Sequence, residues 1–247
     1  MPEILILSAP APALPWLRGH PGVRLSPAIE TTPNLRFRQG DWEREISIGE
    51  PSVNPSGLIE LIDNNPLVCA DYVSVPDPWS ALALIAFGPL ARASMLPESP
   101  VLISSLDDPK DPELVRAFLL AMGGPDGGAL QSEPGDLGSV VAATGWAVIP
   151  TPERMDDLDD LYTEAYGRSF FIHEADDDHW APDVVQNTSM AYYKLAIAPT
   201  EEPSCLIRIQ VLADVKGKLG AAQLIHALNV MVGFEESLGL DPAPTLG

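Results

Sequence analysis

The feature that most constrains the fold is the stretch Tyr72–Ala93, YVSVPDPWSALALIAFGPLARA. A short apolar run, Tyr72–Val75, is followed by a proline-rich turn and then by a segment, Ser80–Ala93, that is apolar on nearly every face. A helix without a polar face has to be buried on all sides, so the rest of the chain must supply layers around it. Pro89 within the segment predicts a kink, because proline has no N–H to donate to the preceding turn.

The turn between this strand and helix is a position at which a nucleophile often lies in α/β enzymes. Its residues are Pro76, Asp77 and Pro78, none of which is a good nucleophile. An aspartate between prolines is typical of turn chemistry, and a role for Asp77 as a new acid or base is the alternative.

A second turn of unusual composition follows the first predicted strand. The run Ile4–Leu7 predicts a buried strand of a parallel sheet, and Ser8–Pro12 then occupies the position of the glycine-rich turn in dinucleotide-binding folds. No glycine is present there, and Pro10 and Pro12 remove two N–H groups that would hold phosphates. The sequence therefore predicts that NADP binding is lost, and we expect no cofactor.

Hydrophobic periodicity and turn residues predict the other elements. We expect helices at residues 57–65, 80–93, 111–122, 153–167 and 220–232, and strands at 35–38, 44–48, 66–75, 100–105, 139–150, 170–174, 190–198 and 204–214. The strands at 35–38 and 44–48 should form a hairpin around Gly40-Asp41, and the last two strands should be antiparallel neighbours. Residues 123–138 are rich in glycine and predict a flexible loop.

Charge limits the classes of partner. The chain carries 35 acidic against 14 basic residues, a net charge of −21, which repels phosphate backbones and anionic lipid. We therefore expect binding neither to nucleic acid nor to membranes. The start of the chain lacks the basic residues of a signal peptide, so we expect a cytoplasmic protein.

Cysteine and histidine are scarce. Cys69 and Cys205 are expected to be free thiols that pack in strands rather than nucleophiles. His173 and His179 lie close together in FFIHEADDDHW, where a cation could bind. An acidic, solvated loop is the ordinary interpretation of that stretch, and we expect no metal.

The C-terminal stretch carries the most specific pattern. Residues 213–240, ADVKGKLGAAQLIHALNVMVGFEESLGL, resemble the closing segment of N-acetyl-γ-glutamyl-phosphate reductases. The matching positions are Lys218, Ala221, Gln223, Asn229, Met231 and Gly233. DDLYTEAYGRSFFI and QNTSMAYYKLAIA are similar to a helix–strand unit and a later strand of that family, and residues 73–96 are similar to its strand–turn–helix. Residues 72–96 and 148–240 carry the likeness, and aspartate-semialdehyde dehydrogenases share the architecture as a more distant match.

The resemblance implies a reductase mechanism whose parts are missing from this sequence. Members of the family use a cysteine thiolate that attacks an acyl phosphate, a histidine as acid and base, and NADPH as the hydride donor. The cysteine position falls on Pro78, and no histidine lies between Leu102 and Pro150, where the family has one. Glu153 stands where an arginine is expected, and the phosphate-binding glycines are missing. We therefore expect a degenerate member of the family that has lost the reaction.

Five polar residues remain as candidates for binding or for new chemistry. Asp77 and His226 are candidate acid or base groups, while Lys216, Lys218 and Gln223 are candidate ligand-binding groups. The two lysines are notable in so acidic a chain, and an anion would bind there first. For His226 and Gln223 on the last predicted helix, the alternative role is packing or capping.

The patterns and the resemblance together predict an α/β fold. We expect a truncated Rossmann-like portion at residues 1–72, joined by the C-terminal segment 216–247, and an α+β dimerisation domain with a mainly antiparallel sheet at residues 73–215. The reductases pair their subunits through that sheet, so the resemblance implies a homo-oligomer, most simply a dimer.

Three functions compete at this point. The first is a non-catalytic paralogue that acts in binding or assembly through its dimerisation sheet, with itself or with a different protein partner. The second is an enzyme with different chemistry on an acidic amino-acid derivative in the reused pocket. The third is a divergent NADP-dependent acyl-phosphate reductase. We expect the first, because several parts of the mechanism are missing together whereas the features that specify the fold remain.

Overall fold

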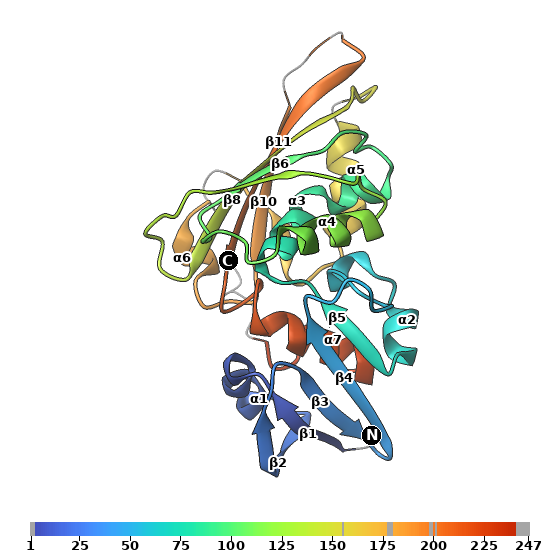
Figure 1. Ribbon diagram of the computed structural model, residues 1–247, viewed down its shortest axis with the longest axis vertical. Helices are drawn as coiled ribbons and strands as arrows, with labels where there is room; N and C mark the ends of the chain where they lie inside the picture. Colours follow the sequence, from blue (N-terminus) through green and yellow to red (C-terminus); the bar gives the residue numbers. More distant parts are fainter. Residues whose placement is uncertain (1–2, 155, 177–179, 198–199, 201, 241–247) are drawn as a thin grey trace.

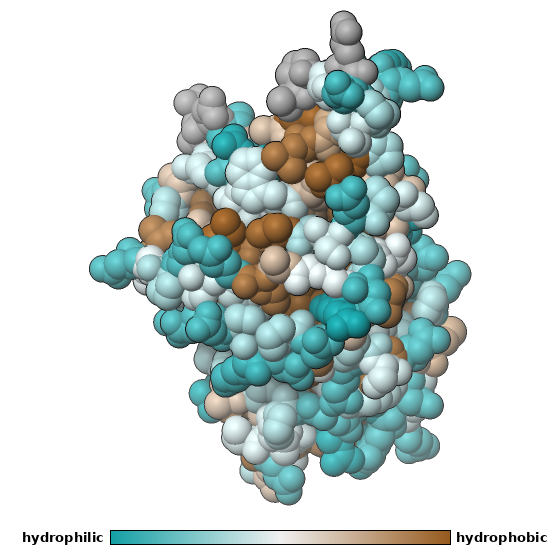
Figure 2. All heavy atoms as spheres, turned by 45° about the horizontal axis from the view of Figure 1, so that its top comes forward, coloured by the Kyte–Doolittle hydropathy of each residue, from teal (hydrophilic) through white to brown (hydrophobic). Residues whose placement is uncertain are grey.

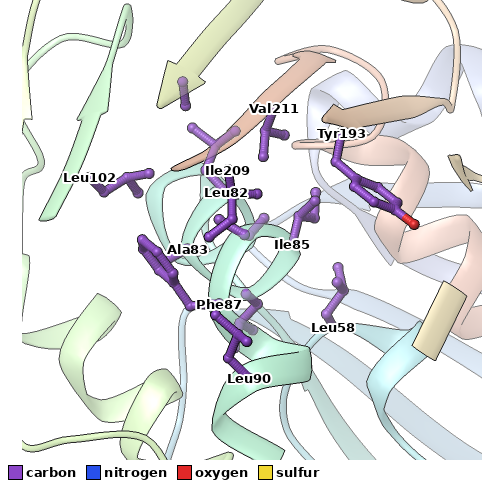
Figure 3. Close-up of a cluster of buried hydrophobic side chains, with 14 of the residues drawn as sticks. Leu58, Leu82, Ala83, Ile85, Phe87, Leu90, Leu102, Tyr193, Ile209 and Val211 are labelled. Atoms are coloured by element: carbon purple, nitrogen blue, oxygen red, sulfur yellow. The ribbon is translucent and has the colours of Figure 1, made fainter. Parts of the chain in front are cut away.

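The buried helix predicted from the sequence, α3 (Pro78–Arg92), lies at the centre of the molecule. The computed structural model describes residues 3–154, 156–176, 180–197, 200 and 202–240. Every residue of α3 from Trp79 to Ala91 is buried, as expected for a helix with no polar face. Figure 3 shows Leu82 and Ile85 of this helix packed towards Ile209 and Val211.

The first part of the chain forms a five-stranded sheet in the order β2-β1-β3-β4-β5. Its strands are β1 (Ile4–Ala9), β2 (Val23–Thr31), β3 (Leu35–Gln39), β4 (Trp42–Ile48) and β5 (Tyr72–Val75). The connections contain η1 (Ala11–Ala13), α1 (Leu14–Gly19), η2 (Ile59–Leu61) and α2 (Asn64–Cys69). The expected parallel sheet is wrong, because β1 pairs parallel with β2 but antiparallel with β3. The predicted hairpin is the reason: β3 and β4 are joined by a tight turn at Gly40, which has a φ of 65°, and such a turn can join only antiparallel strands.

The second part forms a six-stranded sheet in the order β7-β6-β8-β11-β10-β9. The strands are β6 (Val101–Ser104), β7 (Ala129–Ser132), β8 (Val140–Pro150), β9 (Ile172–Glu174), β10 (Ala191–Ile197) and β11 (Ser204–Asp214). The three inner pairs are antiparallel and the two outer pairs are parallel, so the prediction of a mainly antiparallel sheet is confirmed. Helices α3, α4 (Pro112–Ala121) and α5 (Asp156–Tyr166) pack on one face of this sheet, and the short α6 (Pro182–Val185) lies beside β11 (Figure 1).

Three predictions about local structure are wrong. Cys69 was expected within a strand over residues 66–75, but it is the exposed last residue of α2, and the strand begins only at Tyr72. The predicted flexible loop 123–138 contains β7, which pairs parallel with β6. Residues 64–69 instead form a helix that packs against α7, and β7 is an edge strand without a buried residue, so neither segment shows the apolar pattern typical of its element. The expected helix over 57–65 is only the single turn η2.

The last helix, α7 (Ala221–Val232), connects the two sheets. It follows β11 of the six-stranded sheet and packs against β4, β5, α1 and α2 of the N-terminal part. In Figure 1 the five-stranded sheet lies at the lower end, the six-stranded sheet at the upper end, and α7 between them. The division into residues 1–72 with 216–247 and residues 73–215 stays a prediction. None of the described helices is both long and apolar enough to cross a membrane.

Candidate functional site

The turn before α3 is occupied by helix-capping contacts. Asp77 accepts a hydrogen bond from the Trp79 backbone N–H at 3.3 Å and a second from the Ser80 hydroxyl. Pro78 is the first helical residue, where proline is favoured because its missing N–H would have no partner in the helix. Both carboxylate oxygens of Asp77 therefore hold the start of the helix, and the position that would present a nucleophile presents a proline ring.

Gln223 joins α7 to the same turn. Its Nε2 donates to the carbonyl of Pro76 at 3.4 Å, and its Oε1 is buried without a hydrogen-bond partner among the described residues. The structure thus brings Gln223 beside the turn, as a packing contact between α7 and the chain before α3.

Lys218 and His226 lie in a buried ionic cluster with two glutamates, which we call the Glu60 cluster: Glu60, Lys218, His226 and Glu236. Lys218 Nζ donates to Glu60 Oε1, and the side chains of both residues are only 2–3% exposed. His226 Nε2 lies 3.0 Å from Glu236 Oε2, while its Nδ1 lies 3.6 Å from Glu60 Oε1. Phe171 covers the cluster, with its ring 4.5 Å from the His226 ring and 5.3 Å from Lys218 Nζ.

The partners of the two glutamates in the cluster favour their ionised forms. Burial by itself raises the pKa of Glu60, but Lys218 and His226 outweigh it, so the pKa lies below the ordinary value and the carboxyl is ionised. The hydrogen bond with His226 likewise lowers the pKa of Glu236, against the effect of burial. The arrangement holds ionised groups in fixed places across sequence-distant segments, and Oε2 of Glu60 is left without a partner.

The two lysines expected to act together are separated by the turn that carries them. Lys218 is buried in the Glu60 cluster, whereas the Lys216 side chain is exposed. The turn is fixed by Asp214, whose carboxylate accepts from the backbone N–H groups of Lys216 and Gly217 at 2.6 and 3.0 Å. A Cβ atom on Gly217 would lie 1.7 Å from the carbonyl oxygen of Thr188, so this close approach requires glycine. Asp77 lies neither in the Glu60 cluster nor in the turn that carries Lys216. The structure therefore does not bring the candidate acid, base and lysines together in one site.

The turn after β1 does not fit a dinucleotide. Ala13 N–H donates back to the carbonyl of Pro10 at 2.9 Å, and Ser8 Oγ accepts from the Thr32 hydroxyl. Ala9 and Ala13 are fully buried in the core that contains α7. The Ala13 N–H is therefore already bonded within the turn, and Pro10 and Pro12 have no N–H to offer a pyrophosphate.

Sequence reasoning missed two groups of buried polar residues. Glu60 carries a signal, as the only charged residue in the apolar stretch 57–62, GLIELI. Arg44 carries none: it lies within a strand, yet its guanidinium donates to the carbonyls of Leu67, Ala70 and Met231 at the ends of α2 and α7. Burial lowers the pKa of Arg44 to about 10.

The predicted metal and thiol residues are dispersed. His173 Nε2 lies 3.2 Å from the carbonyl of Phe170, and His179 lies outside the described residues. Across the described ranges, no three histidine, cysteine, aspartate or glutamate side chains lie close enough together to hold a metal ion. Cys205 is buried on β11, and Cys69 is exposed at the end of α2.

Comparison with known proteins places the fold. No family model and no curated protein matches the sequence. The crystal structure of aspartate semialdehyde dehydrogenase II from Vibrio cholerae is similar, with a TM-score of 0.59 and 9% sequence identity, covering 93% of this chain and 99% of that chain. At this identity the likeness shows the fold alone: a Rossmann-like portion followed by a domain of the semialdehyde dehydrogenase dimerisation type.

Proposed function

We propose that this chain is a non-catalytic relative of the semialdehyde-forming reductases, and that it works in assembly by pairing with a second copy through its six-stranded sheet. The proposal covers three points that the fold leaves open: that the family reaction is lost, that the cofactor is lost, and that the sheet is an interface.

The observation that carries the proposal is the surface of the six-stranded sheet opposite α3. Towards α6 this surface is buried, at Tyr192 and Leu212. We call a group of exposed side chains on the remainder the open face; they point away from α3 and are all at least partly exposed. They are Val101, Ile103, Thr144, Trp146, Val148, Ala196, Leu206, Arg208 and Gln210. Leu206 is 50% and Val101 36% exposed, so large apolar side chains contact water here.

The open face is continuous, and none of its nine described side chains is acidic. The strand register places Val101, Trp146, Arg208 and Ala196 in one row across four strands. The Arg208 guanidinium lies 5.9 Å from the Trp146 ring centroid, over an aromatic surface. Figure 2 shows apolar residues gathered below the grey atoms at the top of this view, with hydrophilic residues around them. In a chain of net charge −21, such a face is where two copies repel each other least.

The residues at the start of α3 support the proposed loss of acyl-phosphate reduction. Acyl-phosphate reduction needs a group that is both a nucleophile and a leaving group, which cysteine supplies and proline does not. Pro78 lies at that position, and Asp77 beside it is used in capping. The packed turn Ser8–Pro12 supports the loss of the cofactor.

Two measurements test the proposal. Light scattering should give a mass in solution of twice the 26.5 kDa of the single chain, and a single-chain mass at every concentration would contradict the assembly. Titration with NADPH up to about 1 mM should give no saturable fluorescence change, whereas an affinity in the micromolar range would contradict the loss of the cofactor. An N-acetyl-γ-glutamyl-phosphate reductase, from the NADPH-using family that the sequence resembles, provides the control for the cofactor titration.

A further inference from the structure

A large cavity lies at the C-terminal end of α3, away from the turn at its start. Its volume is about 790 Å³, within the range of small-molecule sites. Pro89, Arg92 and Ala93 line it from the end of α3, and α5 and the segment from Ile59 to Pro66 form its other walls. With a rise of about 1.5 Å per residue, the length of α3 separates this cavity from Pro78 by about 20 Å. The cavity also shares no residue with the open face.

The wall of the cavity contains charges of both signs. Six charged side chains line it: Glu60, Asp63, Glu164, Glu236, Arg92 and Arg168. Four carboxylates line the wall against two guanidiniums, and Lys218 behind the wall neutralises Glu60, so one negative charge remains in excess. The carbonyl groups at the C-terminus of α3 add partial negative charge. A ligand with a net positive charge fits this balance.

The Glu60 carboxylate on the wall has one oxygen that can accept a further hydrogen bond. Glu60 is almost fully buried, and its Oε1 accepts from Lys218, but its Oε2 has no partner among the described residues. A buried acceptor without a donor destabilises the fold, and a donor group of a bound ligand would remove that cost. An ammonium group of a ligand would supply the donor, with Glu236 of the same cluster nearby.

The two arginines on the wall are suited to bind an anionic group of a ligand. Arg92 and Arg168 form no hydrogen bond or ion pair within the part of the chain that the structure describes, although acidic residues far outnumber basic ones. Most of the other exposed arginines are paired with glutamate or aspartate. A guanidinium recognises a carboxylate through two parallel N–H donors. Two unpaired guanidiniums on one cavity therefore suit the carboxylate of a small molecule.

We propose that this cavity binds a basic amino acid: a small molecule with one carboxylate, directed to Arg92 and Arg168, and ammonium groups directed to Glu60 and Glu236. The net charge of such a ligand, +1, matches the one carboxylate that remains in excess once Arg92, Arg168 and Lys218 are counted against the four carboxylates. The site is a binding site and requires no reaction.

Calorimetric titration of the full chain tests the proposal, with three probes that separate its parts. L-Lysine carries all the proposed groups, putrescine lacks the carboxylate, and L-glutamate has the opposite net charge. We expect saturable binding of one L-lysine per chain and at least tenfold weaker binding of the other two probes. Arg168→Ala should weaken L-lysine binding about tenfold, because a charge-assisted hydrogen bond is lost from an exposed position that the fold does not need.

Arg18→Ala is the matched control, since Arg18 is also exposed and forms no ion pair among the described residues but lies outside the cavity, and it should leave the affinity unchanged. Failure of L-lysine to bind, equal binding of putrescine, stronger binding of L-glutamate, or an unchanged affinity in Arg168→Ala would each overturn the proposal.

Discussion

His20 is a buried polar residue whose hydrogen bonds determine its tautomer. Its Nδ1 accepts from the Gly22 backbone N–H at 3.0 Å, so the proton is on Nε2, which lies 2.9 Å from Asn229 Oδ1. Asn229 in turn donates to the carbonyls of Glu236 and Leu238 at 2.9 and 2.8 Å. The neutral ring thus joins the end of α1, α7 and the segment after α7.

This environment predicts a dependence of stability on pH. Burial lowers the pKa of His20 below the ordinary 6.5, so the unfolded chain binds a proton at a higher pH than the folded chain. The contribution to the free energy of unfolding is complete above pH 6.5 and falls as the pH decreases from 6.5 to the folded pKa. Urea unfolding at a series of pH values measures the free energy of unfolding. In this window, that free energy should change less with pH in His20→Gln than in the native chain.

His173→Gln is the control for this prediction, because His173 lies on the edge strand β9 and makes no contact with the His20 group. If the free energy of unfolding changed equally with pH in His20→Gln and in the native chain, His20 would not contribute to the pH dependence of stability.

The sequence indicates single residues only where their role is local. Asp77, between two prolines and before an apolar helix, could be recognised as a turn and capping residue. The ion pair of Glu60 and Lys218 could not be predicted, because 158 positions separate the two residues and no local sequence pattern indicates that they are in contact. The separation of Lys216 from Lys218 likewise depends on Asp214 and on the close approach at Gly217, which only the folded chain shows.

At the scale of elements, α3 shows how a buried helix with an internal proline is stabilised. Pro89 cannot donate to the carbonyl of Ile85, four residues earlier. Tyr166 on α5 supplies the missing donor, with its hydroxyl 3.1 Å from the carbonyls of both Leu84 and Ile85. Tyr162, one turn earlier on α5, donates to the carbonyl of Ala86. Two tyrosines of a neighbouring helix therefore satisfy carbonyl groups that water cannot reach.

Replacement of Tyr166 by phenylalanine should destabilise the fold. The variant keeps the buried ring but leaves the Ile85 carbonyl without a donor, which we expect to cost about 1–3 kcal/mol in the free energy of unfolding. Tyr72→Phe is the matched control: its hydroxyl donates to Glu50 at 2.8 Å in a partly exposed place, where water can replace it, and the expected cost is smaller. Chemical unfolding of both variants measures the difference, and a loss as small as that of Tyr72→Phe would refute the proposed role.

Elements with a strong local pattern were predictable, and elements that depend on distant pairing were not. The α4 helix has an aspartate cap at Asp111 and a glycine stop at Gly123, which has a φ of 87°, and its prediction is confirmed. The edge strand β2 was not predicted, because it has Pro27 in its middle and no fully buried residue. Proline is tolerated there because an edge strand has one row of N–H groups without partners.

At the scale of the whole molecule, charge and the open face act against each other. Two chains of net charge −21 repel, while burial of the apolar side chains of the open face favours pairing. The fold class could be predicted from the buried helix and the alternating strands. The residues of the open face could not be recognised from sequence. They alternate with core residues, as the outer residues of any half-exposed strand do, and only the absence of a covering helix over them distinguishes this face.

This opposition predicts a dependence of pairing on salt. Salt screens the repulsion between two acidic chains, with a screening length of about 10 Å at 0.1 M, and leaves apolar burial in place. The dimer should therefore dissociate less in 300 mM than in 20 mM sodium chloride, by about tenfold or more in the dissociation constant from sedimentation velocity. Weaker pairing at the higher salt concentration would indicate an interface held by ion pairs instead.

The most direct test of pairing through the open face is the mass of two matched variants in solution. Leu206→Glu places a charge on the open face, and Leu120→Glu places one on α4, at a leucine of nearly equal exposure, 51% against 50%. By light scattering, Leu206→Glu should have the single-chain mass of 26.5 kDa, whereas Leu120→Glu should retain twice that mass. A Leu206→Glu variant that remains dimeric would contradict the account.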